Sequence, residues 1–198
     1  MDEDIETIEY RGYAIHIKQD LDVESPREWD NLGTMTCFHK RYNLGDKQLI
    51  SIKGYQDWLK ENRHNLIILP LFLLDHSGIT IRTVSFNDPW DSGQVGHIYV
   101  SKEKAMKEFG WGKLTNERIE NVKDILRQEV DTYDRYLTGS VCGFSIEESI
   151  FDDSCWGYYD KNQAVEDAKS SIDSNLKELE LMEFKTIGQM LVLPELGI

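Results

Sequence analysis

The chain contains few cysteines, and their spacing does not suggest that they pair. The 198 residues include only Cys37, Cys142 and Cys155, which are widely separated and form no CxxC motif. An odd and scattered set of cysteines argues against a disulfide framework and against a zinc site built from cysteine alone. We therefore expect three free thiols, buried as isolated cysteines usually are.

Long apolar runs and linkers are also missing. No stretch approaches the roughly 20 consecutive apolar residues that a membrane-spanning helix needs. The chain begins MDEDIETIEY, which is acidic where a secretion signal would be basic and then apolar. The four prolines mark no linker, and the sequence contains no internal repeat. These features predict a cytoplasmic protein without a membrane partner, folded as a single domain over residues 1–198.

Basic residues are outnumbered by acidic ones, and unevenly along the chain. With 36 acidic and 22 basic residues the net charge is −14; residues 1–30 carry −7 and residues 121–198 carry −9, whereas residues 31–120 carry +2. Such a field repels nucleic acid and steers the protein towards a strongly basic partner, so no direct nucleic-acid binding is expected. A merely solubilising surface is the alternative interpretation, including for the cluster Glu147, Glu148, Asp152 and Asp153, which the sequence places in a loop.

The hydrophobic pattern predicts an α+β fold with a mostly antiparallel sheet, because strands occur in a group and do not alternate regularly with helices. A long central amphipathic helix, expected to be the longest, begins at Thr115 and carries one apolar stripe from Ile119 to Leu137. A C-terminal helix is predicted over 163–184, and shorter helices over 56–64 and after Ser101. Strands are predicted over 13–19, 34–42, 66–74, 79–84, 95–100, 140–146 and 155–159.

Potential metal ligands gather where these strands end. They are Cys37 and His39 in TMTCFHKRY, Asp75 and His76 in LLDHSG, Asp88 and Asp91 in NDPWDSG, and His97 in GHIYV. Residues i and i+2 share one face of a strand, so Cys37 and His39 are expected to project together. Two imidazoles with one or two carboxylates form a set that zinc prefers. Zinc is therefore the metal that this pattern favours.

The same residues also have ordinary structural interpretations. Asp75 and Asp91 each precede a small residue and a glycine, where an aspartate commonly accepts hydrogen bonds from backbone N–H groups. Among the tryptophans, Trp29 and Trp156 lie in polar surroundings and could anchor a partner, although burial is the more common position of any single tryptophan. No nucleophile elbow, Walker loop or HExxH motif occurs, while Asp75, Asp88 and Asp91 leave a metal-dependent hydrolase open.

Four strings in the chain resemble a family of small proteins carried by phages, prophages and mobile elements of Gram-positive bacteria. The strings are SPREWDNLGTMTCFHKRYNLGD (25–46), LLDHSGITI (73–81), PWDSGQVGHIYVSKE (89–103) and DDSCWGYY (152–159). The resemblance covers most of the chain and departs at His97, where the family pattern has an aromatic residue. That departure argues against His97 as a ligand.

This family includes a zinc-containing anti-CRISPR protein that blocks a type II RNA-guided effector nuclease. The resemblance thus implies a phage protein that acts in the bacterial cytoplasm as a binding inhibitor and not as an enzyme, blocking target DNA loading by protein–protein contact. Such effectors hold guide and target in positively charged channels, which suits an acidic partner. The implied zinc would be structural, with His39, Asp75, His76 and Asp91 as ligands and Cys37 as the first substitute. A metal-dependent hydrolase acting on nucleotides or nucleic acid stays the alternative, and the oligomeric state is left open.

Overall fold

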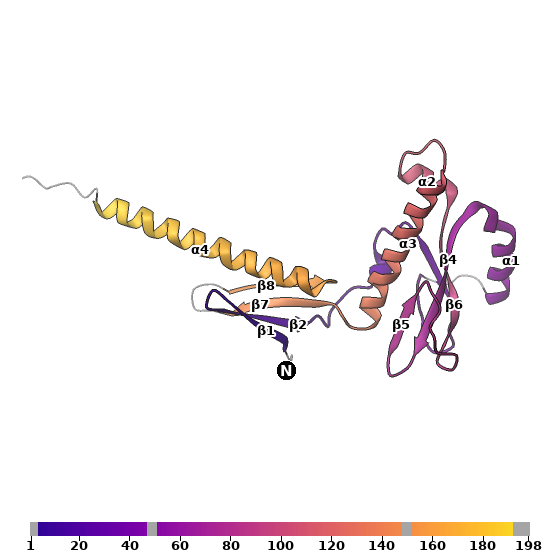
Figure 1. Cartoon of the computed structure of the whole chain (residues 1–198), viewed down its shortest axis with the longest axis horizontal. Coiled ribbons are helices and arrows are strands. Elements are labelled where there is room, and N and C mark those ends of the chain that lie inside the picture. Colours follow the sequence, from indigo (N-terminus) through magenta and orange to yellow (C-terminus); the bar gives the residue numbers. More distant parts are fainter. Residues whose placement is uncertain (1–3, 47–50, 148–151, 192–198) are drawn as a thin grey trace, which may run out of the picture. The chain divides into compact units, whose positions relative to one another are not determined.

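The computed structural model describes residues 4–46, 51–147 and 152–191, which form an α+β fold with two compact units (Figure 1). Unit 1 combines residues 1–22 with residues 141–198, and unit 2 is the continuous segment 23–140 inserted between them. Each unit has its own antiparallel sheet and its own core. The predicted fold class is therefore confirmed, whereas the strands form two sheets where the sequence suggested one.

Unit 1 contains a four-stranded sheet in the order β1-β2-β7-β8. The sequence pattern missed its first strand, because that strand lies at the sheet edge and most of its side chains are exposed. A tight turn joins the first two strands, and Arg11 and Gly12 in this turn both have positive φ, as a two-residue hairpin requires. The strands are β1 (Asp4–Tyr10), β2 (Tyr13–Gln19), β7 (Cys142–Glu147) and β8 (Asp152–Tyr158).

Helix α4 (Lys161–Leu191) covers one face of this sheet, and with 31 residues it is the longest described helix, not the one that follows Thr115. Ala164, Ala168 and Ile172, spaced by four residues, are fully buried against the sheet, where they meet Ile15 and other core residues. Past Ile172 the buried stripe stops, and Figure 1 shows α4 continuing beyond the strands of unit 1.

Unit 2 contains a second four-stranded sheet, in the order β3-β6-β4-β5, with helices on both faces. The stripe predicted after Thr115 is confirmed, since Val122, Leu126, Val130 and Tyr133 of α3 are buried in the core of this unit. The elements are η1 (Pro26–Glu28), β3 (Thr34–Cys37), α1 (Ile52–Asn62), η2 (Arg63–Asn65), β4 (Leu66–Asp75), β5 (Ile79–Arg82), β6 (Ser92–Ser101), α2 (Lys102–Glu108) and α3 (Asn116–Leu137).

Several details of unit 2 follow from single residues. The Ser101 and Thr115 hydroxyls accept hydrogen bonds from the Lys104 and Arg118 amides, so both predicted helix caps are confirmed. Pro70 lies within β4 but before the part of β4 that pairs with β5, which begins at Phe72. Because β4 has a strand on only one side at this point, the missing N–H group of proline is tolerated.

Buried ion pairs hold the segment before β3 against α3. The Arg27 guanidinium, with a side chain only 4% exposed, contacts Asp46 through Nε at 2.8 Å and Glu129 through Nη1 at 3.0 Å. Its remaining nitrogen donates to the Gly33 carbonyl at 2.8 Å. The two carboxylates also accept backbone N–H groups, Asp46 from Met35 and Glu129 from Leu32 and Gly33. Arg27 is therefore the central cation of a buried network.

The three cysteines are free, as the sequence predicted. Cys37 and Cys142 are buried, but Cys155 is exposed on the edge strand β8, so the expectation of burial is wrong for that residue. Among the helices of the described ranges, none combines the length and the apolar character that crossing a membrane requires.

Candidate functional site

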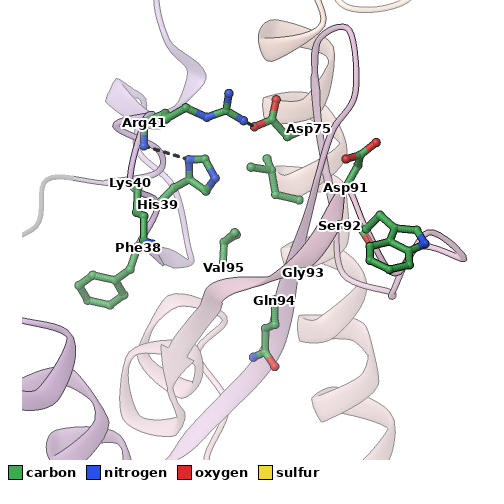
Figure 2. A pocket seen from close by; sticks show the side chains of 12 residues that line it. Phe38, His39, Lys40, Arg41, Asp75, Asp91, Ser92, Gly93, Gln94 and Val95 are labelled. Carbon is green, nitrogen blue, oxygen red and sulfur yellow. Dashed lines mark hydrogen bonds and ion pairs between the residues drawn. The ribbon is translucent and has the colours of Figure 1, made fainter.

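A pocket of about 560 Å³ opens in unit 2 where β3 and β6 diverge. Their pairing ends with Cys37 opposite Gly96, and the Phe38 amide then donates to the Val95 carbonyl at 2.8 Å. Beyond this point residues 38–41 leave the sheet, while β6 runs back to Ser92 paired with β4 alone. Figure 2 shows the two walls of the pocket, with residues 38–41 on one side and Asp75 and residues 91–94 on the other.

Three of the four predicted ligands line this pocket, namely His39, Asp75 and Asp91, and His76 contacts it through Asp91. The His76 Nδ1 atom lies 2.8 Å from an Asp91 carboxylate oxygen. Asp75 is paired with the Arg41 guanidinium and also accepts the Tyr42 hydroxyl at 3.2 Å. The strand ends thus bring the predicted residues to one pocket, where Asp75 pairs with Arg41 and Asp91 pairs with His76.

His39 belongs to neither pair. Its ring stacks on Tyr42 at 5.0 Å between centroids, and its Nδ1 accepts the Arg41 backbone N–H at 3.3 Å. The dashed lines in Figure 2 show how Arg41 joins His39 through its backbone and Asp75 through its side chain. The ring therefore lies on the Arg41 side of the pocket, on a segment outside the sheet.

The predicted zinc ligands have the chemistry that zinc binds, and in the structure they are engaged in other contacts. Zinc takes three or four ligands at about 2.0–2.2 Å. Within the ranges that the structure describes, no three His, Cys, Asp or Glu side chains come together in this way. Arg41 already neutralises Asp75, and His76 already pairs with Asp91. Binding would require both contacts to break, so zinc stays a prediction.

Cys37, the substitute ligand, faces the core of unit 2 and is 4% exposed. Burial, reinforced by the nearby Asp46 carboxylate, raises the pKa of its thiol to about 12, which disfavours the thiolate that metals bind. The expectation that Cys37 and His39 share one strand face is wrong, because β3 ends at Cys37 instead of continuing to Tyr42.

The aspartates also differ from their turn interpretation. It is Asp88 that accepts the backbone N–H groups of Trp90 and Asp91, at 2.9 and 3.0 Å, and these bonds lower the pKa of its carboxyl. Asp75 and Asp91 direct their carboxylates to Arg41 and His76 instead. The turn role that the sequence allowed for Asp75 and Asp91 therefore belongs to Asp88.

We expect the His76–Asp91 pair to be visible in a pH titration. The hydrogen bond and the charge of Asp91 raise the pKa of His76 above its ordinary value of 6.5. A raised pKa means that the pair contributes stability at acidic pH and loses it as the pH rises through that pKa. NMR titration of the imidazole protons should show this, and Asp91→Asn should return the pKa towards 6.5. Asp57→Asn on α1 is the control, and an equal shift in that variant would contradict the assignment.

His97 is not among the residues that line the pocket, although it contacts Gln94, which does line it. Its ring packs 6.1 Å from Tyr55 between centroids, and its nitrogens contact the Tyr55 hydroxyl at 3.3 Å and the Gln94 amide at 3.1 Å. Burial lowers the pKa of His97. This residue therefore belongs to an aromatic cluster with Tyr55 of α1.

Exposed tryptophans are features that the sequence only partly signalled. Trp90, in the pocket wall, is 92% exposed, and Trp29 and Trp156 are about half exposed. The preference for burial is therefore wrong for the two tryptophans noted in polar surroundings, which are the ones the sequence allowed as partner anchors. Trp90 follows a proline and precedes an aspartate, and that polar turn was the available signal.

The negative charge falls almost entirely on unit 1. Its segments contain 19 acidic and 6 basic residues, a net charge of −13, whereas unit 2 contains 17 and 16, a net charge of −1. The charge that the sequence showed at the two ends of the chain is therefore gathered in one compact unit.

One face of the unit 1 sheet points away from α4, and we call it the open face. Ile15 and Ile17 face α4, so His16 and Lys18, which alternate with them, lie on the open face. The register places Ser145 beside His16 and Gly143 beside Lys18. His16 Nδ1 contacts Asp4 at 2.6 Å, and this bond lowers the pKa of Asp4.

The acidic cluster noted in the sequence borders this face. Glu147 ends β7 and Asp152 begins β8, directly opposite each other in the ladder, so they belong to strands and not to a loop. Glu148 lies outside the described residues. Asp153 accepts a hydrogen bond from Ser171 of α4 and therefore has a structural role.

Comparisons of the chain with models of known protein families, with curated proteins and with solved structures found no match. The resemblance to the phage-borne family stays a prediction made from the sequence.

Proposed function

We propose that this protein is a non-catalytic inhibitor that docks its acidic unit 1 on the positively charged, nucleic-acid-binding surface of another protein. The observation that supports this proposal is the separation of charge, with −13 in unit 1 and −1 in unit 2. Charge spread only for solubility has no need to gather in one unit. The target that the family resemblance implies is a type II RNA-guided effector nuclease in the cytoplasm of a bacterial host.

Electrostatic attraction makes such an inhibitor associate quickly with its target and lets it compete with DNA for the same basic surface. Complementary potentials raise the association rate, and a protein occupying a basic channel excludes the phosphates that would bind there. Exposed carboxylates line the edge strands of the unit 1 sheet, including Asp4 and Glu6 on β1 and Asp152 on β8. These side chains can meet lysines and arginines without first breaking a core.

A cleavage assay with guide-loaded nuclease tests this proposal. Inhibition should be complete near one protein per nuclease and absent when target DNA is loaded first. Binding should weaken with salt, because the Debye length falls from ~10 Å at 0.1 M to ~3 Å at 1 M. A nuclease unaffected at every dose would contradict the proposed target. Inhibition far below equimolar dose, with a modified nucleotide or nucleic acid as product, would favour the hydrolase alternative.

Zinc enters this proposal as a structural ion implied by the resemblance. We expect elemental analysis of protein purified without chelators to find about one zinc per chain, bound at the pocket by His39, Asp75, His76 and Asp91. His76→Ala should then lose the metal and melt at a lower temperature, since metal binding and folding are coupled. If the wild-type protein contains no zinc, the predicted zinc site is wrong. The Arg41–Asp75 ion pair would then be the native arrangement at the pocket.

A further inference from the structure

A hollow of about 640 Å³ lies at the β7–β8 end of unit 1. Its lining includes Ser145, Glu147, Asp152 and Ser154, which the register places as two directly opposed pairs, Ser145 with Ser154 and Glu147 with Asp152. Ser145 also pairs with His16, so both pairs lie on the open face. Two carboxylates and two hydroxyls therefore share one side of two neighbouring strands.

The Ser145 hydroxyl is the unusual member of this group. The residue is only 8% exposed, and its oxygen has no hydrogen-bond partner among the residues that the structure describes. A buried hydroxyl without a partner costs free energy, and most native proteins avoid it. Glu147, in contrast, is 70% exposed, and its nearest cation is the Lys18 ammonium at 3.6 Å. The hollow thus has an unsatisfied polar group at depth and negative charge at its rim.

An exposed aromatic ring, Trp156, lies on the same face of the sheet and lines a neighbouring hollow with residues 19–22. A Cβ atom added at Gly143 would lie 2.5 Å from the Trp156 ring, so this ring lies directly over Gly143 on the open face. Gly143 is two residues from Ser145 along β7, and residues two apart share a strand face. The indole is 45% exposed. Glu147 is four residues from Gly143 along β7, about 13 Å at 3.3 Å per residue, so the ring lies apart from the two carboxylates.

We propose that this hollow binds an arginine side chain of the partner protein, an inference that rests on the proposed function. A guanidinium presents a planar fork of N–H donors, which carboxylates accept in pairs. Its other donors can satisfy the Ser145 hydroxyl oxygen. A lysine ammonium lacks this fork, so arginine is the better match for two opposed carboxylates.

Short basic peptides test this inference directly. Fluorescein-labelled hexaarginine should bind the full-length protein at least about fivefold more tightly than hexalysine, measured by anisotropy at fixed salt. The variant Glu147→Gln/Asp152→Asn should weaken hexaarginine binding at least about tenfold. The control Glu178→Gln/Glu180→Gln removes the same charge from exposed positions of α4, and should change binding less than about twofold. Equal losses in the two variants, or equal binding of the two peptides, would overturn the proposal.

Ser145→Ala separates binding from folding. Removal of an unsatisfied buried hydroxyl should leave the melting temperature unchanged or higher, while hexaarginine binding falls by about threefold or more because a hydrogen bond is lost. Unchanged peptide binding in this folded variant would contradict the role of Ser145.

The nuclease assay distinguishes failure of this site from failure of the proposed function. If the Glu147→Gln/Asp152→Asn protein inhibits the nuclease as well as wild type does, the arginine site is wrong and the function stands. If wild type binds hexaarginine selectively but leaves the nuclease untouched, the site stands and the target is wrong.

Discussion

Replacing Arg27 by methionine should lower the free energy of unfolding by about 3–5 kcal/mol, because removal of one partner from a buried ion pair leaves its counter-charge uncompensated. Here the Arg27 side chain is 4% exposed and pairs with Glu129, which is 12% exposed, and with Asp46, which is 27% exposed. Methionine keeps most of the aliphatic volume, so the loss reports the charge and not a cavity. Urea unfolding followed by circular dichroism measures it.

The matched control is Arg127→Met on α3. Arg127 pairs with Asp124 one turn away, and its side chain is 42% exposed. Exposed pairs of this kind contribute roughly 0–1 kcal/mol. A loss at Arg27 no larger than the loss at Arg127 would mean that the network around Arg27 is solvated in solution.

Gly96→Ala should be the most damaging small substitution in unit 2, with a loss above about 3 kcal/mol from overpacking against rigid backbone. A Cβ atom at this position would lie 1.9 Å from the Thr36 carbonyl oxygen. Since that oxygen belongs to the backbone of β3, no side-chain rotation relieves the clash. The two strands would have to separate where Cys37 pairs with Gly96, at the entrance to the pocket. Thermal unfolding measures the loss.

Gly93→Ala in the same strand is the control for Gly96. Nothing lies within 4 Å of a Cβ added at Gly93. The substitution should therefore change stability by less than about 1 kcal/mol, the usual range for glycine and alanine exchanges without strain. A comparable loss at both positions would show that strand propensity, and not the contact with Thr36, decides the effect.

Periodicity predicted the individual elements well because it reports which side of an element is buried. The apolar stripe on α3 and the alternating apolar residues of β2 are both buried, each in the core of its own unit. Periodicity does not report which strands pair, however, and β2 finds its neighbour β7 more than a hundred residues later. The division into two sheets depends on that long-range choice. Strand β1 lies at an edge with most of its side chains exposed, and only Ile8 and Tyr10 pack against the core, which is too short a pattern to reveal the strand.

The candidate site shows the same limit at the level of side chains. His39, Asp75 and Asp91 could be placed at one pocket from their positions at strand ends. The sequence did not show that Arg41 would reach Asp75, since the contact depends on β3 ending at Cys37 and releasing the residues that follow. The unsatisfied Ser145 hydroxyl was also invisible, because burial of a small polar residue depends on its neighbours across the sheet.

The insertion of unit 2 within unit 1 imposes an order on folding. Residues 23–140 are contiguous, so their sheet and α3 can assemble as soon as that segment has been synthesised. The β1–β2 hairpin, made first, must wait for β7 to emerge before its sheet can grow, and α4 comes later still. Pairing across so long a separation is slow unless the ends are brought together. Once unit 2 has folded, the segment between β2 and β7 is no longer a flexible loop of more than a hundred residues, and we expect the acidic unit to form after it.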